Sequence, residues 1–379
     1  MTKLIVKEAT TKKEMKQFVH FPNALYAGNK YYVPQIESMD MATFDRNRNH
    51  AFEVCDGKFW LAYDEQGKVV GRVAGIINRS YNKKVQEKIC RFGWIDFIDN
   101  EEVSKALLDA VEQYARAEGM DTVSGPTGFL EFDVAGILVD GFDEIPTAYG
   151  KYNAPYYETH LVHHGYDKEM DYVEYRINIP ESFPQRFTNA ARIVALKNGL
   201  HEAPLYAHGD LLDYADGIFR CMNSAYSVLH GYSELTEGQC EDLKKQFFKN
   251  INLDFISVIL NETNEVVAFG ICLPSLSKAL QKANGRLFPF GFLHILRALR
   301  HNDTLDTLLI AVTNKYKNKG VNAMIFDKMW RGIKKHGIKY VESTRELEDN
   351  CSVQNLWSRF DHRMHKRARI YRKQLDETP

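Results

Sequence analysis

The chain has 379 residues, of which 44% are hydrophobic and 26% charged, a composition that suits a globular protein with two cores. A net charge of −1 excludes a global electrostatic attraction to nucleic acid, so we expect no nucleic-acid partner. The six cysteines are scattered without a C-x-x-C motif, no signal-peptide core is recognisable, and no run of about 18 apolar residues occurs. These features predict a cytoplasmic protein without a spanning helix.

The first half of the sequence predicts a β-hairpin followed by alternating strands and helices. Two apolar stretches flank a turn at 64–67, which is typical of a hairpin. From Glu101 onward, apolar residues recur three and four positions apart, which predicts an amphipathic helix that ends before Gly119. The further predicted elements of this half are strands at 59–63, 69–77, 92–98, 121–124 and 172–177, and a helix at 155–164.

The second half repeats this order of elements, although its residues differ from those of the first half. Its predicted strands are at 255–260, 266–273, 305–312, 339–343 and 367–372, with a helix that begins near Val321 and stops at Gly337 and another at 352–363. The repeated order indicates a tandem duplication. We divide the chain into lobes of residues 1–178 and 179–379, next to the proline-bracketed stretch 180–184.

The two halves differ in the connection between the third strand and the following helix. Only Asp99 and Asn100 separate them in the first half, whereas residues 313–323 intervene in the second. Free backbone N–H groups at a helix N-terminus attract phosphate, and glycine lets an anion approach closely. This predicts a phosphate-binding loop; the alternative is a lysine-rich surface loop without function. The candidate residues are Thr313, Lys317, Asn318, Lys319, Gly320, Val321, Asn322 and Ala323.

The layout of strand, basic glycine loop, helix, strand and then asparagine before a helix resembles that of the GNAT acyl-CoA transferases. Their loop signature is Gln/Arg-x-x-Gly-x-Gly/Ala, and residues 317–322 keep its central glycine with Lys and Asn at its ends. The resemblance implies acyl-CoA (coenzyme A with its acyl group) as cosubstrate, with Asn350 holding the pantetheine arm. Trp357 stands where the family often has a tyrosine as general acid. Either another group supplies that proton or this lobe is not catalytic in the usual way.

The resemblance covers nearly the whole chain. It implies an α/β (α+β) fold of two tandem GNAT-like lobes, each a mixed, mostly antiparallel sheet flanked by helices, with one site on the C-terminal lobe roofed by the N-terminal lobe. The opening segment 21–34 is similar to that of a bacterial two-lobed GNAT-like group. In outline the chain also resembles GNAT-like bacterial ceramide synthases, which N-acylate a sphingoid base.

An insert at 274–304 distinguishes the second half further. Within it, the segment 286–300 is apolar, aromatic and basic, with Arg297 and Arg300 at the rim of a predicted apolar helix side. Such a segment favours peripheral contact with a membrane or lipid. The alternative is a helix packed on the core or on another subunit.

Three acids are candidates for the catalytic base. Glu131 and Asp133 lie in a long glycine-rich and aromatic loop, and Glu342 ends the strand beside the basic loop. Any of them could take a proton from an attacking amine if burial raised its pKa toward neutrality. The alternative for the two loop acids is a purely solvated role. We expect no metal, because no third ligand accompanies the histidines at 160–164.

The sequence therefore supports three hypotheses. The first is an acyltransferase that moves an acyl group from acyl-CoA, or from an acyl carrier, to a small-molecule amine or lipid acceptor. The second is a catalytically inactive GNAT-like protein that binds CoA or lipid, which Trp357 and the altered loop favour. The third is an aminoacyl-tRNA-dependent transferase, which the near-neutral charge makes less attractive.

Overall fold

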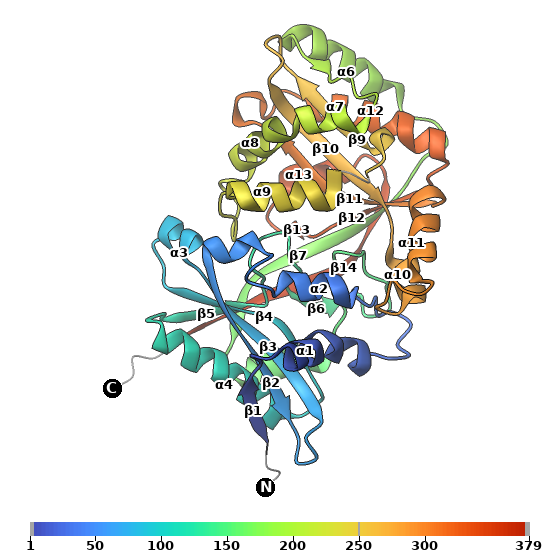
Figure 1. The fold of residues 1–379 in the computed structure, drawn as a ribbon. Coiled ribbons are helices and arrows are strands. Elements are labelled where there is room, and N and C mark those ends of the chain that lie inside the picture. The colour runs from blue at the N-terminus through green and yellow to red at the C-terminus, as the bar shows by residue number, and fades with distance from the viewer. Residues whose placement is uncertain (1–3, 249–250, 376–379) are drawn as a thin grey trace.

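The computed structural model describes residues 4–248 and 251–375 of the chain. The described strands join into one twisted sheet that extends through both halves, with helices packed against its two faces (Figure 1). Across the sheet the order is β1-β2-β3-β4-β5-β14-β7-β12-β11-β10-β9-β8, with β6 paired to β14 and β13 to β7. The predicted fold class, a mixed and mostly antiparallel sheet flanked by helices, is confirmed.

The first half contains the seven predicted elements in their predicted order. Helix α4 buries Val103, Leu107 and Val111 against the sheet, and Gly119 follows it with a φ of +73°. The elements are β1 (Ile5–Glu8), α1 (Lys12–Leu25), α2 (Glu37–Thr43), η1 (His50–Glu53), β2 (Cys55–Tyr63), β3 (Val69–Asn78), α3 (Arg79–Val85), β4 (Ile89–Phe97), α4 (Glu101–Ala117), β5 (Thr122–Gly125), β6 (Ile137–Asp140), α5 (Tyr156–His163) and β7 (Asp167–Asn178).

The second half follows the same order after a helical entry. Its elements are α6 (Gln185–Asn198), β8 (His201–Glu202), α7 (His208–Asp213), α8 (Ala215–Tyr226), α9 (Glu237–Leu243), η2 (Lys244–Phe248), η3 (Leu253–Phe255), β9 (Ile256–Leu260), β10 (Val266–Pro274), α10 (Ser277–Ala283), α11 (Gly291–Arg300), β11 (Thr304–Val312), η4 (Asn314–Tyr316), α12 (Asn322–His336), β12 (Tyr340–Ser343), β13 (Glu346–Leu347), α13 (Cys351–Trp357) and β14 (Asp361–Gln374). The predicted helix 352–363 was too long and both closing strands were too short. Strands β7 and β14 extend further because they pair with each other.

The two halves exchange their closing strands at the centre of the sheet. Strand β14, from the end of the chain, pairs with β5 of the first half, where Tyr371 lies opposite Gly125. Strand β7, from the first half, pairs with β12 of the second half, where Val341 lies opposite Ile177. The exchanged strands also pair antiparallel with each other along most of their length. Each half therefore depends on the other to complete its sheet.

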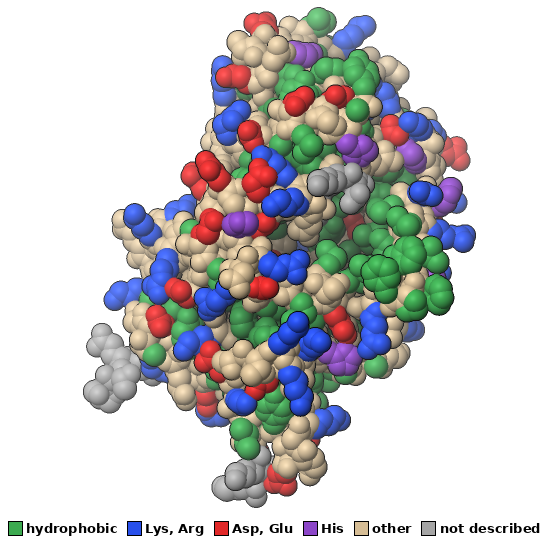
Figure 2. All heavy atoms as spheres, viewed as in Figure 1, with side chains coloured by type: hydrophobic (Ala, Val, Ile, Leu, Met, Phe, Trp, Pro, Cys, Tyr) green, Lys and Arg blue, Asp and Glu red, His purple; other side chains and the backbone are tan. Residues whose placement is uncertain are grey.

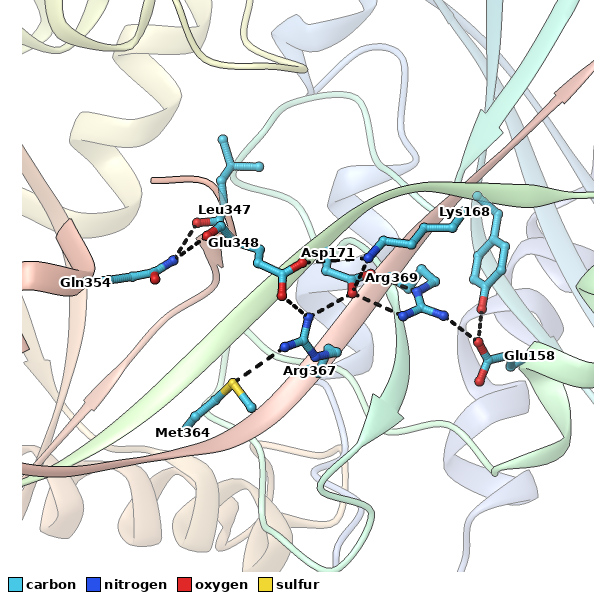
Figure 3. Close-up of polar contacts among 10 residues, drawn as sticks. Glu158, Lys168, Asp171, Leu347, Glu348, Gln354, Met364, Arg367 and Arg369 are labelled. Atoms are coloured by element: carbon cyan, nitrogen blue, oxygen red, sulfur yellow. Dashed lines mark hydrogen bonds and ion pairs between the residues drawn. The ribbon is translucent and has the colours of Figure 1, made fainter. Parts of the chain in front are cut away.

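A buried ion cluster joins the exchanged strands (Figure 3). Asp171 of β7 accepts hydrogen bonds from Lys168 at 2.8 Å, from Arg367 of β14 at 2.8 Å and from Nε of Arg369 at 2.7 Å. Burial alone would raise the pKa of Asp171, but the hydrogen bonds from these three cations hold it well below its usual range. Arg369 also donates to Glu158 at the start of α5. The cluster fixes the register of β7 against β14.

Candidate active site

The seam between β11 and β12 opens at a β-bulge. The two strands pair in parallel from Thr304, opposite Tyr340, to Thr307, opposite Ser343. Beyond this point β11 pairs only with β10, and a register shift leaves Leu308 as an extra residue on β11. A bulge bends its strand and turns backbone groups out of the ladder. The edge of β11 beyond Leu308 therefore faces an opening instead of a neighbouring strand.

A cavity of about 280 Å³ occupies this opening. Helix α8 lines it from one face of the sheet and α12 from the other, so the cavity spans the sheet. Its walls are mostly apolar, and they include Phe219, Met222, Ile310, Ile325, Met329 and Trp357. Glu131, Phe132 and Tyr149 of the first half also border it. A cavity of this lining suits hydrocarbon and thioether groups and has few polar groups to orient them.

The predicted phosphate loop lies close in sequence to two residues of the cavity lining, although none of residues 313–323 lines the cavity itself. Ile310 and Ile325, which line the cavity, lie three residues before Thr313 and three residues after Asn322. Asn318 and Gly320 adopt φ values of +63° and +78°, the left-handed conformation that their residue types tolerate. These angles place the loop in a tight turn just before helix α12.

The N-terminus of α12 is open to an anion. Among the described residues, the backbone N–H groups of Asn318, Gly320, Val321 and Asn322 have no hydrogen-bond acceptor. Other N–H groups of the loop are bonded: Thr313 N donates to Val267 O of β10, Lys319 N donates to Tyr316 O, and Ala323 N donates to Gly320 O. The side chains of Lys317 and Lys319 are exposed, and Nζ of Lys319 lies 5.0 Å from the ring centre of the buried Tyr316. The arrangement offers unpaired donors and cations at the positive end of the helix dipole.

The first half closes the corresponding positions with its own side chains. Asn100 Oδ1 caps α4 by accepting from the N–H groups of Glu102 and Val103. Strand β4 also parts from β5, but Tyr157 accepts a hydrogen bond from Phe97 N at 3.0 Å and Lys151 Nζ donates to Ile95 O at 2.6 Å. These groups fill the edge of β4 at the position where, in the second half, the corresponding edge of β11 faces a cavity. The predicted asymmetry between the halves thus has a structural basis in these contacts.

The structure separates the three predicted acids. Glu131 is half-buried, borders the cavity and accepts a hydrogen bond from Tyr172 at 2.6 Å. Asp133 does not line the cavity. Its carboxylate accepts a hydrogen bond from Leu130 N at 2.9 Å, and burial raises the pKa of Asp133 to about 6 although this hydrogen bond lowers it. Glu342 lines a different hollow below α11 and pairs with Arg176 at 2.7 Å. Burial raises the pKa of Glu342, and Arg176 opposes this rise.

A fourth acid, Glu346, lies in the cavity wall and was missed from the sequence. Its side chain is buried, and Oε1 accepts a hydrogen bond from Trp357 Nε1 at 2.7 Å. The second oxygen, Oε2, has no partner among the described residues. Burial raises the pKa of Glu346 to about 7, although the Trp357 hydrogen bond and the nearby Ser343 hydroxyl lower it. An acid with this pKa can exchange a proton near neutral pH.

The two residues of the predicted pantetheine site both line the cavity. Asn350 is half-buried at the start of α13, and its side chain does not cap that helix. Within the described part of the chain, its side-chain amide forms no hydrogen bond. Trp357 is buried at the end of α13, and its indole N–H holds Glu346. Trp357 thus positions a carboxyl group, a role that its lack of a titratable proton does not prevent.

Polar contacts of the predicted histidine group lie away from this cavity. His160 is buried between Ser104 Oγ at 2.8 Å and Asp99 Oδ1 at 3.0 Å, and His163 contacts Glu101. The described part of the chain contains no group of three His, Cys, Asp or Glu side chains arranged to hold a metal ion. Nor does any of its helices have the length and apolar character needed to cross a membrane.

Two curated proteins are similar to the chain along almost its whole length. One is the protein YghO of Escherichia coli, 24% identical over 98% of this chain and 95% of that protein. The other is a bacterial ceramide synthase of Caulobacter vibrioides, 24% identical over 96% of both chains. No protein-family model matches the chain.

Solved structures establish the fold. A tandem GNAT protein from the clavulanic acid biosynthesis pathway superposes with a TM-score of 0.57 over all of both chains, at 9% identity. The glucosamine N-acetyltransferase region of a fungal multi-domain β-N-acetylglucosaminidase gives 0.61 at 12% identity, covering 98% of this chain but 38% of that one. The chain therefore has the two-lobed GNAT fold that its sequence predicted.

Proposed function

We propose that this protein is an N-acyltransferase that moves an acyl group from acyl-CoA, or from an acyl-carrier phosphopantetheine, to the amine of a long-chain, amphipathic molecule. The observation that supports this most directly is the apolar cavity at the open seam between β11 and β12, with the carboxyl group of Glu346 in its wall. A thioester and an apolar amine could meet there from opposite faces of the sheet.

The residues around the loop fit the phosphates of the cosubstrate. The free N–H groups at 320–322 and the exposed Lys317 and Lys319 would receive the pyrophosphate. From there the pantetheine arm would enter the seam, where the uncommitted side-chain amide of Asn350 can hydrogen-bond its amide groups. The exposed backbone edge of β11 beyond Leu308 offers further donors and acceptors.

The transfer would proceed by direct attack. The amine nitrogen forms a bond to the thioester carbonyl carbon, and the carbon–sulfur bond breaks as the thiolate leaves. Glu346 accepts the proton of the attacking nitrogen through its unpartnered oxygen and returns it to the departing sulfur. Backbone N–H groups at the bulge would stabilise the developing oxyanion. Glu131, which borders the cavity beside Tyr172, is the alternative proton acceptor.

The walls of the cavity support an apolar acceptor or acyl chain. Phe219, Met222 and Tyr226 of α8 and Phe132 of the first half present rings and alkyl groups, with few charges. A small hydrophilic amine would leave this apolar surface in contact with water, whereas a sphingoid base would bury its hydrocarbon chain against the surface. The similarity to a protein named as a bacterial ceramide synthase agrees with this choice of acceptor.

The test is thiol release from palmitoyl-CoA in the presence of sphinganine, with product identified by mass spectrometry. We expect turnover with this pair, little with a short hydrophilic amine, and a loss of roughly 10²–10³ in kcat in Glu346→Gln with KM little changed. Glu342→Gln, outside the cavity, serves as the matched control. If CoA binds but a panel of long-chain amines gives no thiol, the protein is a non-catalytic CoA- or lipid-binding protein and the proposal fails.

A further inference from the structure

The insert between β10 and β11 presents an exposed apolar surface. Its short helices α10 and α11 pack inward, where Leu287 and Ile295 contact Val33 and Ile36 of the first half. The outer side remains uncovered: Phe288 is 77% exposed, Phe290 68%, Leu293 50% and Leu296 45%. Figure 2 shows these hydrophobic side chains gathered at the right-hand edge of the molecule, over α10 and α11. We call these four residues the apolar patch.

The apolar patch lies outside the buried core of the insert. Helix α11 packs inward through the partly buried Ile295, and Phe288 of the patch contacts Phe292 of the same insert at a ring-centre distance of 5.7 Å. Exposed aromatic and aliphatic side chains that cluster in this way usually mark an interaction surface, because leaving them in water is unfavourable. Burial against a partner would remove that cost.

The charge around the apolar patch identifies the kind of partner. Residues 275–301 contain five lysines and arginines and no aspartate or glutamate, in a chain whose net charge is −1. The five side chains are exposed, and none lies within ion-pair distance of an acid in the described part of the chain: Lys278, Lys282, Arg286, Arg297 and Arg300. Lys278, Lys282 and Arg297 also line the hollow that contains Glu342. Unpaired cations beside exposed phenylalanine and leucine complement a surface that is anionic outside and apolar beneath.

We propose that the insert docks this protein on an anionic lipid bilayer. Phe288, Phe290, Leu293 and Leu296 enter the boundary between headgroups and acyl chains, and the five cations contact lipid phosphates. Ser277 Oγ donates to Pro146 O at 2.7 Å, in the loop whose Tyr149 lines the cavity. Docking would thus bring the cavity within one loop of the membrane surface, where an amphipathic amine or its product resides. The docking does not require that the proposed acyl transfer be correct.

Sedimentation of the full chain with vesicles tests this proposal. We expect binding to vesicles of mixed phosphatidylglycerol and phosphatidylcholine and little to pure phosphatidylcholine. Phe288→Ser/Phe290→Ser should lower the partition coefficient at least about tenfold, since two inserted rings are lost. Arg297→Gln/Arg300→Gln should lower it by about tenfold or more.

Two matched variants control for exposure and charge elsewhere. Ile193→Ser/Leu196→Ser removes two exposed apolar residues of α6, and Lys12→Gln/Lys13→Gln removes two exposed cations of α1. Both should bind vesicles as the unmodified chain does. Equal loss in the controls, or no binding to anionic vesicles at all, would overturn the proposal. So would a lipid-independent dimer that Phe288→Ser/Phe290→Ser converts to a monomer in light scattering, since the apolar patch would then bind a second copy.

Discussion

The indole N–H of Trp357 donates to Oε1 of Glu346 at 2.7 Å, with both side chains buried in the wall of the cavity. This hydrogen bond gives Trp357 a structural role at a position where the resemblance suggested a tyrosine. The indole supports a carboxyl group whose other oxygen is unpartnered among the described residues. The proton transfer expected of a tyrosine at position 357 would thus need both residues, with Glu346 carrying the proton and Trp357 holding Glu346 in place.

Trp357→Phe should move the pH dependence of activity without abolishing activity. The indole N–H favours the ionised form of Glu346 and lowers its pKa, so its loss should raise that pKa above about 7. The acidic limb of a kcat/KM profile should then shift to higher pH. Trp330→Phe is the control, because Trp330 lines the same cavity and, among the described residues, it is Trp357 that donates its indole N–H to Glu346. An unmoved limb would show that Glu346 is not the base.

Gly320→Asp should weaken CoA binding. Gly320 has a φ of +78°, and an added Cβ would come 3.3 Å from a methyl group of Val194, so the substitution strains the turn and adds a negative charge. Gly337→Asp is a close control at the other end of α12, with a φ of +66° and open space around it. Calorimetry should show at least a tenfold weaker Kd for the first variant only. Equal affinity of both variants would place the phosphates elsewhere.

Glu174→Gln should flatten the dependence of stability on pH. Glu174 is buried on β7, and burial raises its pKa to about 7 despite the opposing effect of Lys366. The unfolded chain loses this proton at lower pH than the folded chain, so ionisation of Glu174 reduces stability as pH rises from about 4.5 to 7. Urea unfolding at several pH values should show a smaller decline in the variant. A decline as steep as that of the unmodified chain would contradict this.

Asp171→Asn should destabilise the protein by about 3 kcal/mol, because it leaves Arg367, Arg369 and Lys168 without their shared anion. The pKa of Asp171 is held low in the folded state, so this contribution is present at neutral pH and is lost as pH falls through that pKa. The exposed pair Lys105–Asp109 gives the comparison: Asp109→Asn should cost about 0.5 kcal/mol. Chemical unfolding at neutral pH measures both. Similar costs would show that the cluster does not hold the exchanged strands.

Local patterns predicted the elements of the duplicated order, because hairpins and amphipathic helices are encoded by neighbouring residues. The turn at 64–67 and the stop at Gly337 are of this kind. These patterns did not predict helices such as α1 and α2, which precede the first hairpin. The exchange of β7 and β14 could not be predicted, since the duplicated order of elements is equally compatible with two self-contained sheets. Strand pairing between distant segments leaves no signal in either strand alone.

The candidate base, too, could not be selected from local sequence patterns. Glu342 and Glu346 are four residues apart and equally plausible by type. Period-two alternation places Glu342 on one face of β12, but the bulge at Leu308 decides where the cavity opens. The chain then turns into β13, where Glu346 meets Trp357. Only the three-dimensional arrangement selects Glu346 and directs Glu342 toward Arg176.

The exchange of closing strands also determines what the first half needs to complete its sheet. Gly125 on β5 receives its partner strand from Tyr371 of the second half, so the sheet of the first half cannot close before β14 is present. Until β14 pairs, the edge of β5 is unpaired, and such edges promote aggregation. A chain that lacks β14 would retain that edge, even though every other element of the first half is present. The first half is therefore not an independent folding unit.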